Sequence, residues 1–271
     1  MRRVVFTQKG GVGKSSIACN LAAISAARGL RTLVVDLDPQ GNASEYLLDA
    51  RAAGLSHTVQ DFFEQTLSIK NLISSADPET FVHATRFPNL SVMPSGPELD
   101  FLQPKLEARQ KIYKLRDALD KLGRRYDRIF VDTAPAANFF TRSALIAANR
   151  CLVPFDCDNF SRQSLYQVLE TIGELREDHN PGLRLEGIVV NQFQPNAKLP
   201  QTLIDELVAE GLPVLPQHLS QSVKMRESHQ AHLPLIHLAP QHKLTLQFVE
   251  LFEGLEGAQA KGLKRDASRA S

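Results

Sequence analysis

The sequence predicts a single α/β domain with a mostly parallel, twisted sheet that helices flank on both faces. Five short apolar runs, rich in β-branched side chains, recur along the 271 residues, and longer amphipathic segments separate them. Apolar residues follow one another in these runs instead of alternating with polar ones, which is typical of strands that are buried on both faces. Strand and helix signals that alternate along the chain predict βαβ units and therefore parallel pairing.

The expected elements follow one another in a regular order. The strands are predicted at 4–6, 33–35, 129–131, 151–153 and 188–190. The amphipathic segments predict helices at about 14–28, 97–122, 139–148, 160–178 and 199–210. Residues 49–96 depart from this pattern, and they predict short helical pieces at 59–65 and 69–74 and a strand at 90–93.

The carboxyl-terminal part predicts one more amphipathic helix and then a tail. The apolar stripe of this helix consists of Leu244, Phe248, Leu251 and Leu255. Its polar face is acidic, whereas a helix on a membrane surface carries Lys and Arg there, so we expect the helix to close the core. Residues 257–271 are small, polar and basic, and we expect a disordered tail after a folded domain of residues 1–256.

Composition narrows the classes of function. The chain has 31 Lys and Arg against 30 Asp and Glu, so any surface for nucleic acid must be a local patch. No apolar run approaches the ~20 residues that a membrane span needs, and we expect no membrane partner. The 3 cysteines are scattered and predict no disulfide framework, which indicates a reducing, cytoplasmic setting.

The strongest motif lies between the first strand and the first helix, where residues 8–16 read QKGGVGKSS. Glycines let backbone N–H groups turn around phosphate oxygens, and the helix that begins near Lys14 adds the positive end of its dipole. Lys14 can reach the β- and γ-phosphates, and Ser15 can offer its hydroxyl to Mg²⁺. The predicted nucleotide-binding residues are Gly10, Gly11, Val12, Gly13, Lys14, Ser15 and Ser16.

The start of this loop departs from the general phosphate-loop pattern. Gln8 stands where the first glycine is expected, and Lys9 is an additional lysine. In both respects the sequence resembles the deviant Walker A ATPases and, among them, the ParA partition ATPases, which carry QKGGVGK. The resemblance implies that Lys9 acts in trans on the ATP of the partner subunit in a face-to-face dimer. A second cation suits phosphoryl transfer, because charge stabilisation and positioning supply most of its catalysis.

Three aspartates follow strands at one expected edge of the sheet. Asp36 and Asp38 lie in DLDPQGNAS, where alternation along the strand places both on one side, and Asp132 ends the strand in RIFVDTAP. A strand that ends in aspartate is the Walker B arrangement, in which the carboxylate holds Mg²⁺ through water. By resemblance, Asp38 joins Lys9 and Lys14 as a catalytic residue that orients or activates the attacking water.

The same resemblance assigns Asp36 to the magnesium shell, together with Ser15 and Asp132. A capped turn before a short helix is the alternative interpretation of Asp36 and Asp38.

Two further residues are candidates for contact with adenine. Asn191 ends the strand in GIVVN, and Pro216 lies in LPQH. In the ParA family, residues at these points lie next to the base, and an amide can both donate hydrogen bonds to it and accept them. An Asn that caps a turn between strand and helix has the same appearance in the sequence, so this alternative stays open.

The resemblance also implies non-specific DNA binding through basic residues, mostly in the carboxyl-terminal half. The candidates are Arg162, Lys198, Lys224, Arg226 and Lys243. Contacts with phosphates give affinity without sequence preference and weaken steeply with salt. A solvated helix face is the alternative for each of these residues, and it is the interpretation that we prefer for the second basic segment, 105–128.

The resemblance extends from residue 4 to about 255 and is to the small members that have no amino-terminal DNA-binding domain. It implies a slow switch ATPase that uses ATP and Mg²⁺, dimerises with ATP and coats nucleoid DNA in the cytoplasm. It also implies that a ParB-like or adaptor protein stimulates hydrolysis and that the cycle segregates a chromosome or plasmid.

Two other functions use the same fold. The same ATPase can position a protein cargo, such as a chemotaxis cluster, a microcompartment, or a flagellar or pilus site. A metabolic enzyme is the second alternative, and Gln8 and the absence of cluster-binding cysteines disfavour it.

Overall fold

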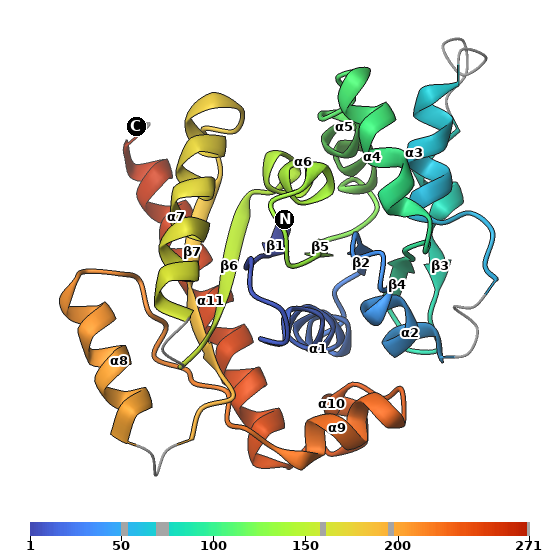
Figure 1. The fold of residues 1–271 in the computed structure, drawn as a ribbon. Coiled ribbons are helices and arrows are strands. Elements are labelled where there is room, and N and C mark those ends of the chain that lie inside the picture. The colour runs from blue at the N-terminus through green and yellow to red at the C-terminus, as the bar shows by residue number, and fades with distance from the viewer. Residues whose placement is uncertain (50–53, 69–75, 158–160, 195–197, 270–271) are drawn as a thin grey trace.

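A seven-stranded sheet forms the centre of the described structure (Figure 1). The computed structural model describes residues 1–49, 54–68, 76–157, 161–194 and 198–269. The strands are β1 Arg2–Val5, β2 Thr32–Asp36, β3 His83–Ala84, β4 Leu90–Met93, β5 Arg128–Asp132, β6 Arg150–Asp156 and β7 Arg184–Asn191. Their order is β3-β4-β2-β5-β1-β6-β7, and every neighbouring pair is parallel except β3–β4. The predicted fold class is confirmed.

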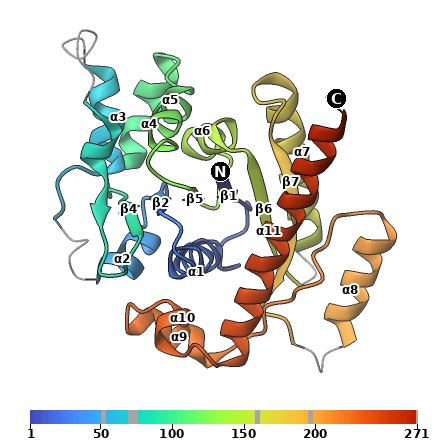
Figure 2. The same ribbon diagram turned by 180° about the vertical axis from the view of Figure 1, so that it is seen from behind.

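Helices cover both faces of this sheet (Figures 1 and 2). They are α1 Lys14–Ala27, α2 Asn42–Leu48, α3 Val59–Leu67, α4 Leu99–Ala108, α5 Lys114–Leu122, α6 Phe139–Ala147, α7 Ser161–Asp178, α8 Lys198–Ala209, α9 Val223–Gln230, α10 Leu235–Leu238 and α11 Lys243–Arg269, with a 3₁₀ turn at Pro78–Phe81. The helical piece predicted at 69–74 lies outside the described residues. Among the helices described, none is both long enough and apolar enough to traverse a bilayer.

The single helix predicted at 97–122 is wrong, because the structure has two helices there, α4 and α5. Gln110 adopts a left-handed backbone conformation, with φ of 52°, just after α4. The N–H of Lys111 then donates to the carbonyl of Leu106 at 3.0 Å, which is the bond of a Schellman motif that ends a helix. Residue periodicity continues across this break, so the sequence pattern alone did not reveal it.

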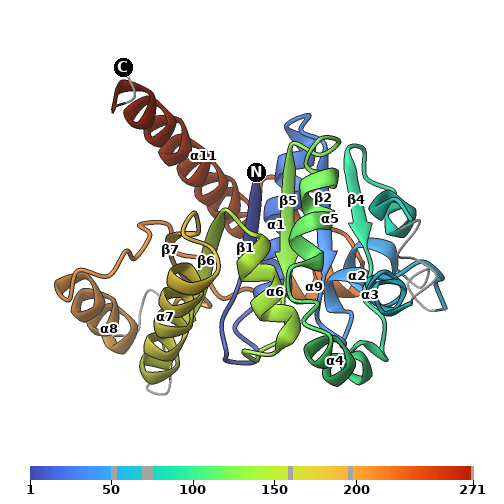
Figure 3. The same ribbon diagram turned by 90° about the horizontal axis from the view of Figure 1, so that it is seen from above.

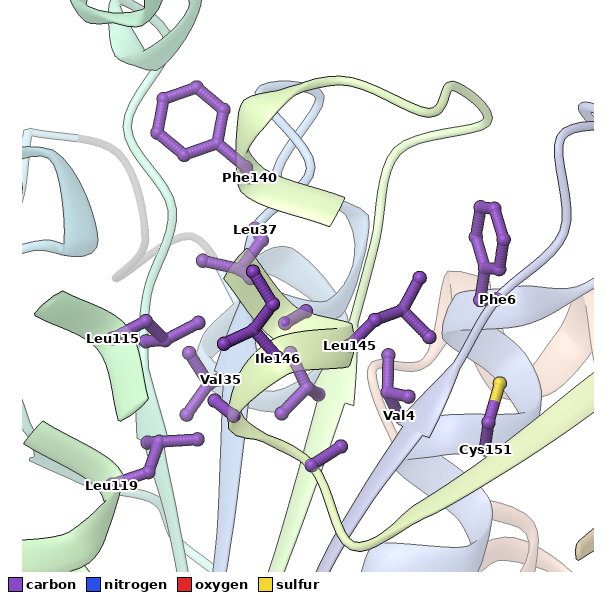
Figure 4. Packing of buried hydrophobic residues seen from close by; sticks show 14 of the residues in the cluster. Val4, Phe6, Val35, Leu37, Leu115, Leu119, Phe140, Leu145, Ile146 and Cys151 are labelled. Atoms are coloured by element: carbon purple, nitrogen blue, oxygen red, sulfur yellow. The ribbon is translucent and has the colours of Figure 1, made fainter. Parts of the chain in front are cut away.

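Neighbouring residues of one strand pack into two different hydrophobic cores, one on each face of the sheet. Val34 of β2 belongs to the core that residues of α1, α2, α10 and α11 share, whereas Val35 belongs to the core that contains residues of α3 to α7. Figure 4 shows the second core, in which Val4 and Val35 of the sheet face Leu115 of α5 and Leu145 of α6. Burial on both faces explains why the strands read as continuous apolar runs.

The parallel strands also determine where polar groups gather. Figure 3 shows the arrows of the central strands pointing toward one edge of the molecule. The carboxyl ends of β1, β2, β5 and β6 therefore meet at that edge, together with the loop from β1 to α1. In open α/β sheets this edge is where ligands bind.

Helix α11 closes one face of the domain, as predicted. Its stripe of Leu244, Phe248, Leu251 and Leu255 is at most 2% exposed, and it packs in the same core as α1. The structure differs from the disordered tail expected at 257–271, because α11 continues to Arg269. Ala, Gln, Lys, Leu and Arg dominate residues 258–265, and these strong helix formers extend the helix beyond its last core residue.

A buried ion cluster joins α11 to the sheet. Arg3 of β1 is fully buried, and it donates to both oxygens of Glu186 at 2.5 and 2.8 Å. Glu256 of α11 accepts from Arg3 at 3.4 Å and from Arg128 of β5 at 2.5 and 3.1 Å. The guanidinium of Arg3 also lies 5.3 Å from the centre of the Phe130 ring. The cluster links three strands to the last helix.

We expect Leu251→Ala to lower the free energy of unfolding by about 2–5 kcal/mol, because it opens a cavity under α11. The matched control is Leu246→Ala on the same helix, whose side chain is 44% exposed and whose loss changes stability by about 0.5 kcal/mol or less. Urea unfolding followed by circular dichroism measures both. Equal midpoints for the two variants contradict a core-closing role for α11.

Candidate functional site

The loop between β1 and α1 has the backbone of an anion-binding turn. Gly11 and Gly13 have φ of 75° and 86°, which side chains other than glycine rarely tolerate. A Cβ on Gly13 would lie 2.4 Å from Nδ2 of Asn191, so no larger residue fits there. No side chain caps α1, and its first backbone N–H groups at Lys14, Ser15 and beyond are available to an anion.

Lys14 lies over this loop and is nearly buried, with 6% of its surface exposed. Its ammonium donates to the carbonyl of Lys9 at 3.2 Å. Burial lowers the pKa of Lys14, while the charges of Asp132 and Asp38 nearby oppose that shift. The structure thus brings a cation, the loop amides and two carboxylates together at one edge of the sheet.

Asp36 and Asp132 occupy adjacent positions at the ends of β2 and β5, and both are fully buried. Burial raises the pKa of Asp36 to about 6. The pKa of Asp132 is raised well above its ordinary value by burial and then by the charge of Asp36, while Ser15 and Lys14 lower it. Two buried carboxylates this close repel each other, and a cation stabilises their charged forms.

The two carboxylates differ in their partners. Asp36 accepts from the backbone N–H and the hydroxyl of Ser44 at 2.8 and 2.7 Å, and from the N–H of Asp38 at 3.1 Å. Within the part of the chain that the structure describes, neither oxygen of Asp132 has a hydrogen-bond partner. Unpaired buried carboxylate oxygens beside a serine hydroxyl suit a hydrated divalent cation. The donor set of Ser15 and Asp132 therefore fits Mg²⁺.

Asp38 lies in the turn that joins β2 to α2. Its side chain is 6% exposed and accepts from the N–H of Gln40 at 3.0 Å, and Gly41 begins α2 with φ of 65°. The turn-capping geometry that the sequence left open is present. It coexists with a carboxylate that is close enough to Lys14 for its charge to oppose the lowering of the lysine's pKa by burial.

Lys9 has a partner that sequence reasoning missed. Its ammonium donates to both carboxylate oxygens of Asp156 at 2.8 Å. Asp156 ends β6, just as Asp36 ends β2 and Asp132 ends β5. An acidic residue at the end of a third strand was the available signal, but the sequence run predicted for this strand stopped at residue 153.

Of the two candidates for adenine contact, Asn191 lies beside the loop. The amide nitrogen of Asn191 donates to the carbonyl of Val12 at 2.9 Å, and that of Gln192 donates to the carbonyl of Gly11 at 2.9 Å. Pro216 is exposed, in a segment that runs beside β7, where Leu215 donates to the carbonyl of Ile188. Asn191 thus contacts the phosphate loop directly, whereas Pro216 lies beside β7, the strand that Asn191 ends.

The basic candidates fall into two groups. Arg162 forms ion pairs with Glu206 and Glu210, and Lys224 pairs with Glu227. The remaining three, Lys198, Arg226 and Lys243, are exposed. In Figure 1, α9 and the first turns of α11 lie along the lower side of the view. Lys224 and Arg226 belong to α9, and Lys243 begins α11.

The comparisons with known proteins agree with this geometry. A family model described as an AAA domain matches residues 3–185. The chain is 34% identical over 204 residues to the chromosome partitioning protein ParA of Myxococcus xanthus, which covers 75% of this chain and 69% of that protein. It is 33% identical over 235 residues to the chromosome-partitioning ATPase Soj of Treponema pallidum, covering 86% and 87%.

A solved structure shows the same fold. The cobyrinic acid a,c-diamide synthase of Mycobacterium smegmatis, crystallised with an ATP analogue and magnesium, superposes with a TM-score of 0.81 at 23% identity and covers 96% of each chain. At this identity the likeness concerns the fold alone, which is a fold that holds a nucleotide and magnesium. The sequence matches are long and similar enough to assign the family. The chain belongs to the ParA-type ATPases of the ParA/MinD superfamily.

Proposed function

We propose that this chain is an ATP-dependent switch that dimerises with ATP, binds DNA non-specifically and segregates a chromosome or plasmid. The observation that carries the proposal is the pair of unpartnered, fully buried oxygens of Asp132 beside Lys14 and Ser15. A buried carboxylate costs free energy unless a cation compensates it, so the site is built for a charged ligand. Relatives named as chromosome-partitioning proteins support this cargo.

Each residue of the loop has a distinct part in this proposal. The backbone N–H groups from Gly10 to Ser16 and the ammonium of Lys14 hold the triphosphate. Ser15 and Asp132 hold Mg²⁺, which supplies charge neutralisation on the phosphates when bound. Asp36 supports the magnesium site without binding the ion directly, because both of its oxygens already accept hydrogen bonds from the turn that carries Asp38 and Ser44.

The catalytic step depends on two charged side chains at the rim. Asp38 orients or activates water, and its place next to Lys14 supports that role. Lys9 is the residue that we propose to act on the partner subunit's nucleotide. Its side chain is 24% exposed and lies at the edge of the site on Asp156, from which it can extend outward. A second cation at the phosphates stabilises charge in the transition state.

For the base, we propose Asn191 and Pro216. The amide nitrogen of Asn191 is held by Val12, so its oxygen is the atom that we propose to accept from the adenine amino group. Pro216 then supplies an apolar surface beside the same strand.

For DNA, we propose the exposed cations Lys198, Arg226 and Lys243, together with Lys224 and Arg162 once their carboxylate partners exchange for phosphates. In this proposal the protein is cytoplasmic and associated with the nucleoid. A ParB-like or adaptor protein stimulates its slow hydrolysis.

We expect Lys14→Ala to weaken ATP binding by about 100-fold or more, because a nearly buried cation on charged phosphates contributes about 3 kcal/mol. Fluorescence titration with a labelled ATP analogue measures the affinity. Lys111→Ala removes a lysine of the connection between α4 and α5, far from the loop in sequence, and leaves the affinity unchanged. Unaltered binding by Lys14→Ala contradicts the assignment of the phosphate loop.

We expect Lys9→Ala and Asp38→Ala to leave nucleotide affinity within about threefold of the unaltered protein but to reduce turnover. For Lys9 the loss is about 10³-fold, the lower end of the effect of a cation supplied in trans. Phosphate release at saturating ATP and DNA measures turnover. Normal turnover in either variant excludes the role proposed for that residue.

We expect Lys224→Ala combined with Arg226→Ala to weaken DNA binding and to reduce the slope of log affinity against log salt by up to about 2. Anisotropy of a labelled DNA fragment between low and moderate salt measures the slope. Lys105→Ala with Arg124→Ala removes the same charge from the segment interpreted as solvated surface and serves as the control. A slope that both double variants share with the unaltered protein argues against the α9 patch.

A further inference from the structure

A histidine of α9 contacts both segments that line the nucleotide site. Nε2 of His229 lies 2.9 Å from the hydroxyl of Ser16, within hydrogen-bond distance. The imidazole ring stacks on the ring of Tyr46, with centroids 4.5 Å apart and planes 20° from parallel. Ser16 belongs to the phosphate loop and the first turn of α1, whereas Tyr46 lies in α2. One side chain of α9 therefore rests on two different elements.

Both elements border the proposed nucleotide site. Ser16 follows Ser15 directly, and its backbone N–H belongs to the open amino-terminal turn of α1. Tyr46 lies two residues beyond Ser44, whose hydroxyl and N–H are bound to Asp36. A shift of either the helix start or the β2–α2 turn is therefore transmitted by direct contact to His229.

Polar contacts around His229 make this junction stiff. Asn20, one turn after Ser16 in α1, donates to the carbonyl of Ser16 at 2.8 Å and accepts from the N–H of Leu235 at 2.8 Å. The hydroxyl of Tyr46 pairs with that of Ser228, the neighbour of His229. Burial lowers the pKa of His229, the charge of His232 adds to this effect, and Glu45 opposes it. A neutral ring suits both the stack and the bond to serine.

Two other residues of α9, Met225 and Ser228, also anchor the helix. Ser228 is the only residue of Val223–Gln230 that is buried. Arg226, one turn before His229, is exposed, and Lys224 precedes it in the first turn. Met225 packs against the core around α1, and the hydroxyl of Ser228 pairs with that of Tyr46 and donates to the carbonyl of Leu233. The bond and the stack of His229 therefore act together with these contacts in determining the position of α9.

We propose that His229 is a positioning residue that couples the state of the phosphate loop to the placement of the basic helix α9. This inference rests on the proposed function, since it gives the nucleotide a direct route to the surface that we assign to DNA. The contacts with Ser16 and Tyr46 determine the position of the His229 ring, and His229 thereby orients the part of α9 that carries Arg226. Two contacts that both respond to one ligand provide a physical link between two sites.

Hydrogen exchange of the whole protein, with and without a non-hydrolysable ATP analogue and Mg²⁺, tests the link without any need for DNA. We expect the analogue to protect residues 10–16 in the unaltered protein and in His229→Ala. Exchange in 223–230 responds to the analogue in the unaltered protein and loses that response in His229→Ala. His237→Ala is the matched control. His237 lies in α10 and its ring stacks on that of Phe87, with centroids 4.7 Å apart, so we expect this variant to keep the response.

DNA affinity with the ATP analogue and with ADP is measured on the same proteins. The ratio of the two affinities falls at least about fivefold in His229→Ala, which is the lower end of typical coupling between sites. A residue that merely stabilised α9 would lower both affinities equally and leave the ratio intact. Ser16→Ala removes the same hydrogen bond from the other side, and its effect on the ratio is not additive with that of His229→Ala.

The outcomes separate the two proposals. An α9 that does not respond to the analogue in the unaltered protein, or that responds equally in His229→Ala, overturns the coupling. An α9 that responds through His229 in a protein that binds no DNA in either nucleotide state supports the coupling and overturns the DNA-binding part of the proposed function.

Discussion

Two aspartates buried side by side, Asp36 at the end of β2 and Asp132 at the end of β5, are the constraint on which the site depends. Their charges repel at short range in a medium that solvates them poorly, which is why burial raises the pKa of both. Hydrogen bonds from Ser44 and Asp38 compensate Asp36, whereas Asp132 depends on Lys14 and Ser15. The carboxylates at this edge of the sheet therefore favour a bound cation, and Lys14 and the loop amides favour the anion that binds with it.

The same constraint gives the turn after β2 its conformation. Because Asp36 holds the N–H and the hydroxyl of Ser44, the chain between them must fold back, and Asp38 is left next to Lys14. Ser44 also accepts from the N–H of Ser95 at 2.9 Å, which ties the turn to the strand beyond β2. A ligand that alters the charge around Asp36 therefore acts on α2 and on its neighbours through bonds that already exist.

Residues from other elements at this edge of the sheet also hold the phosphate loop. Asn191 and Gln192 bind its carbonyls from β7, and Lys9 is held on Asp156 at the end of β6. These contacts join the loop to the ends of β6 and β7, so the loop is supported from two strands while its amides stay open. His229 adds support from α9, which makes the basic helix part of the same assembly.

The sequence by itself determined the alternation of strands and helices, the glycine loop with Lys14, and the aspartates 36, 38 and 132, because buried parallel strands and phosphate loops leave strong local patterns. Tertiary structure alone decided the break at Gln110, the pairing of Lys9 with Asp156 and the contact of Ser16 with His229. These depend on one backbone torsion, or on residues 147 and 213 positions apart that the order of strands and the packing of α9 bring together. Contacts of that kind have no local signature, since a sequence records what each element prefers and not which elements will become neighbours.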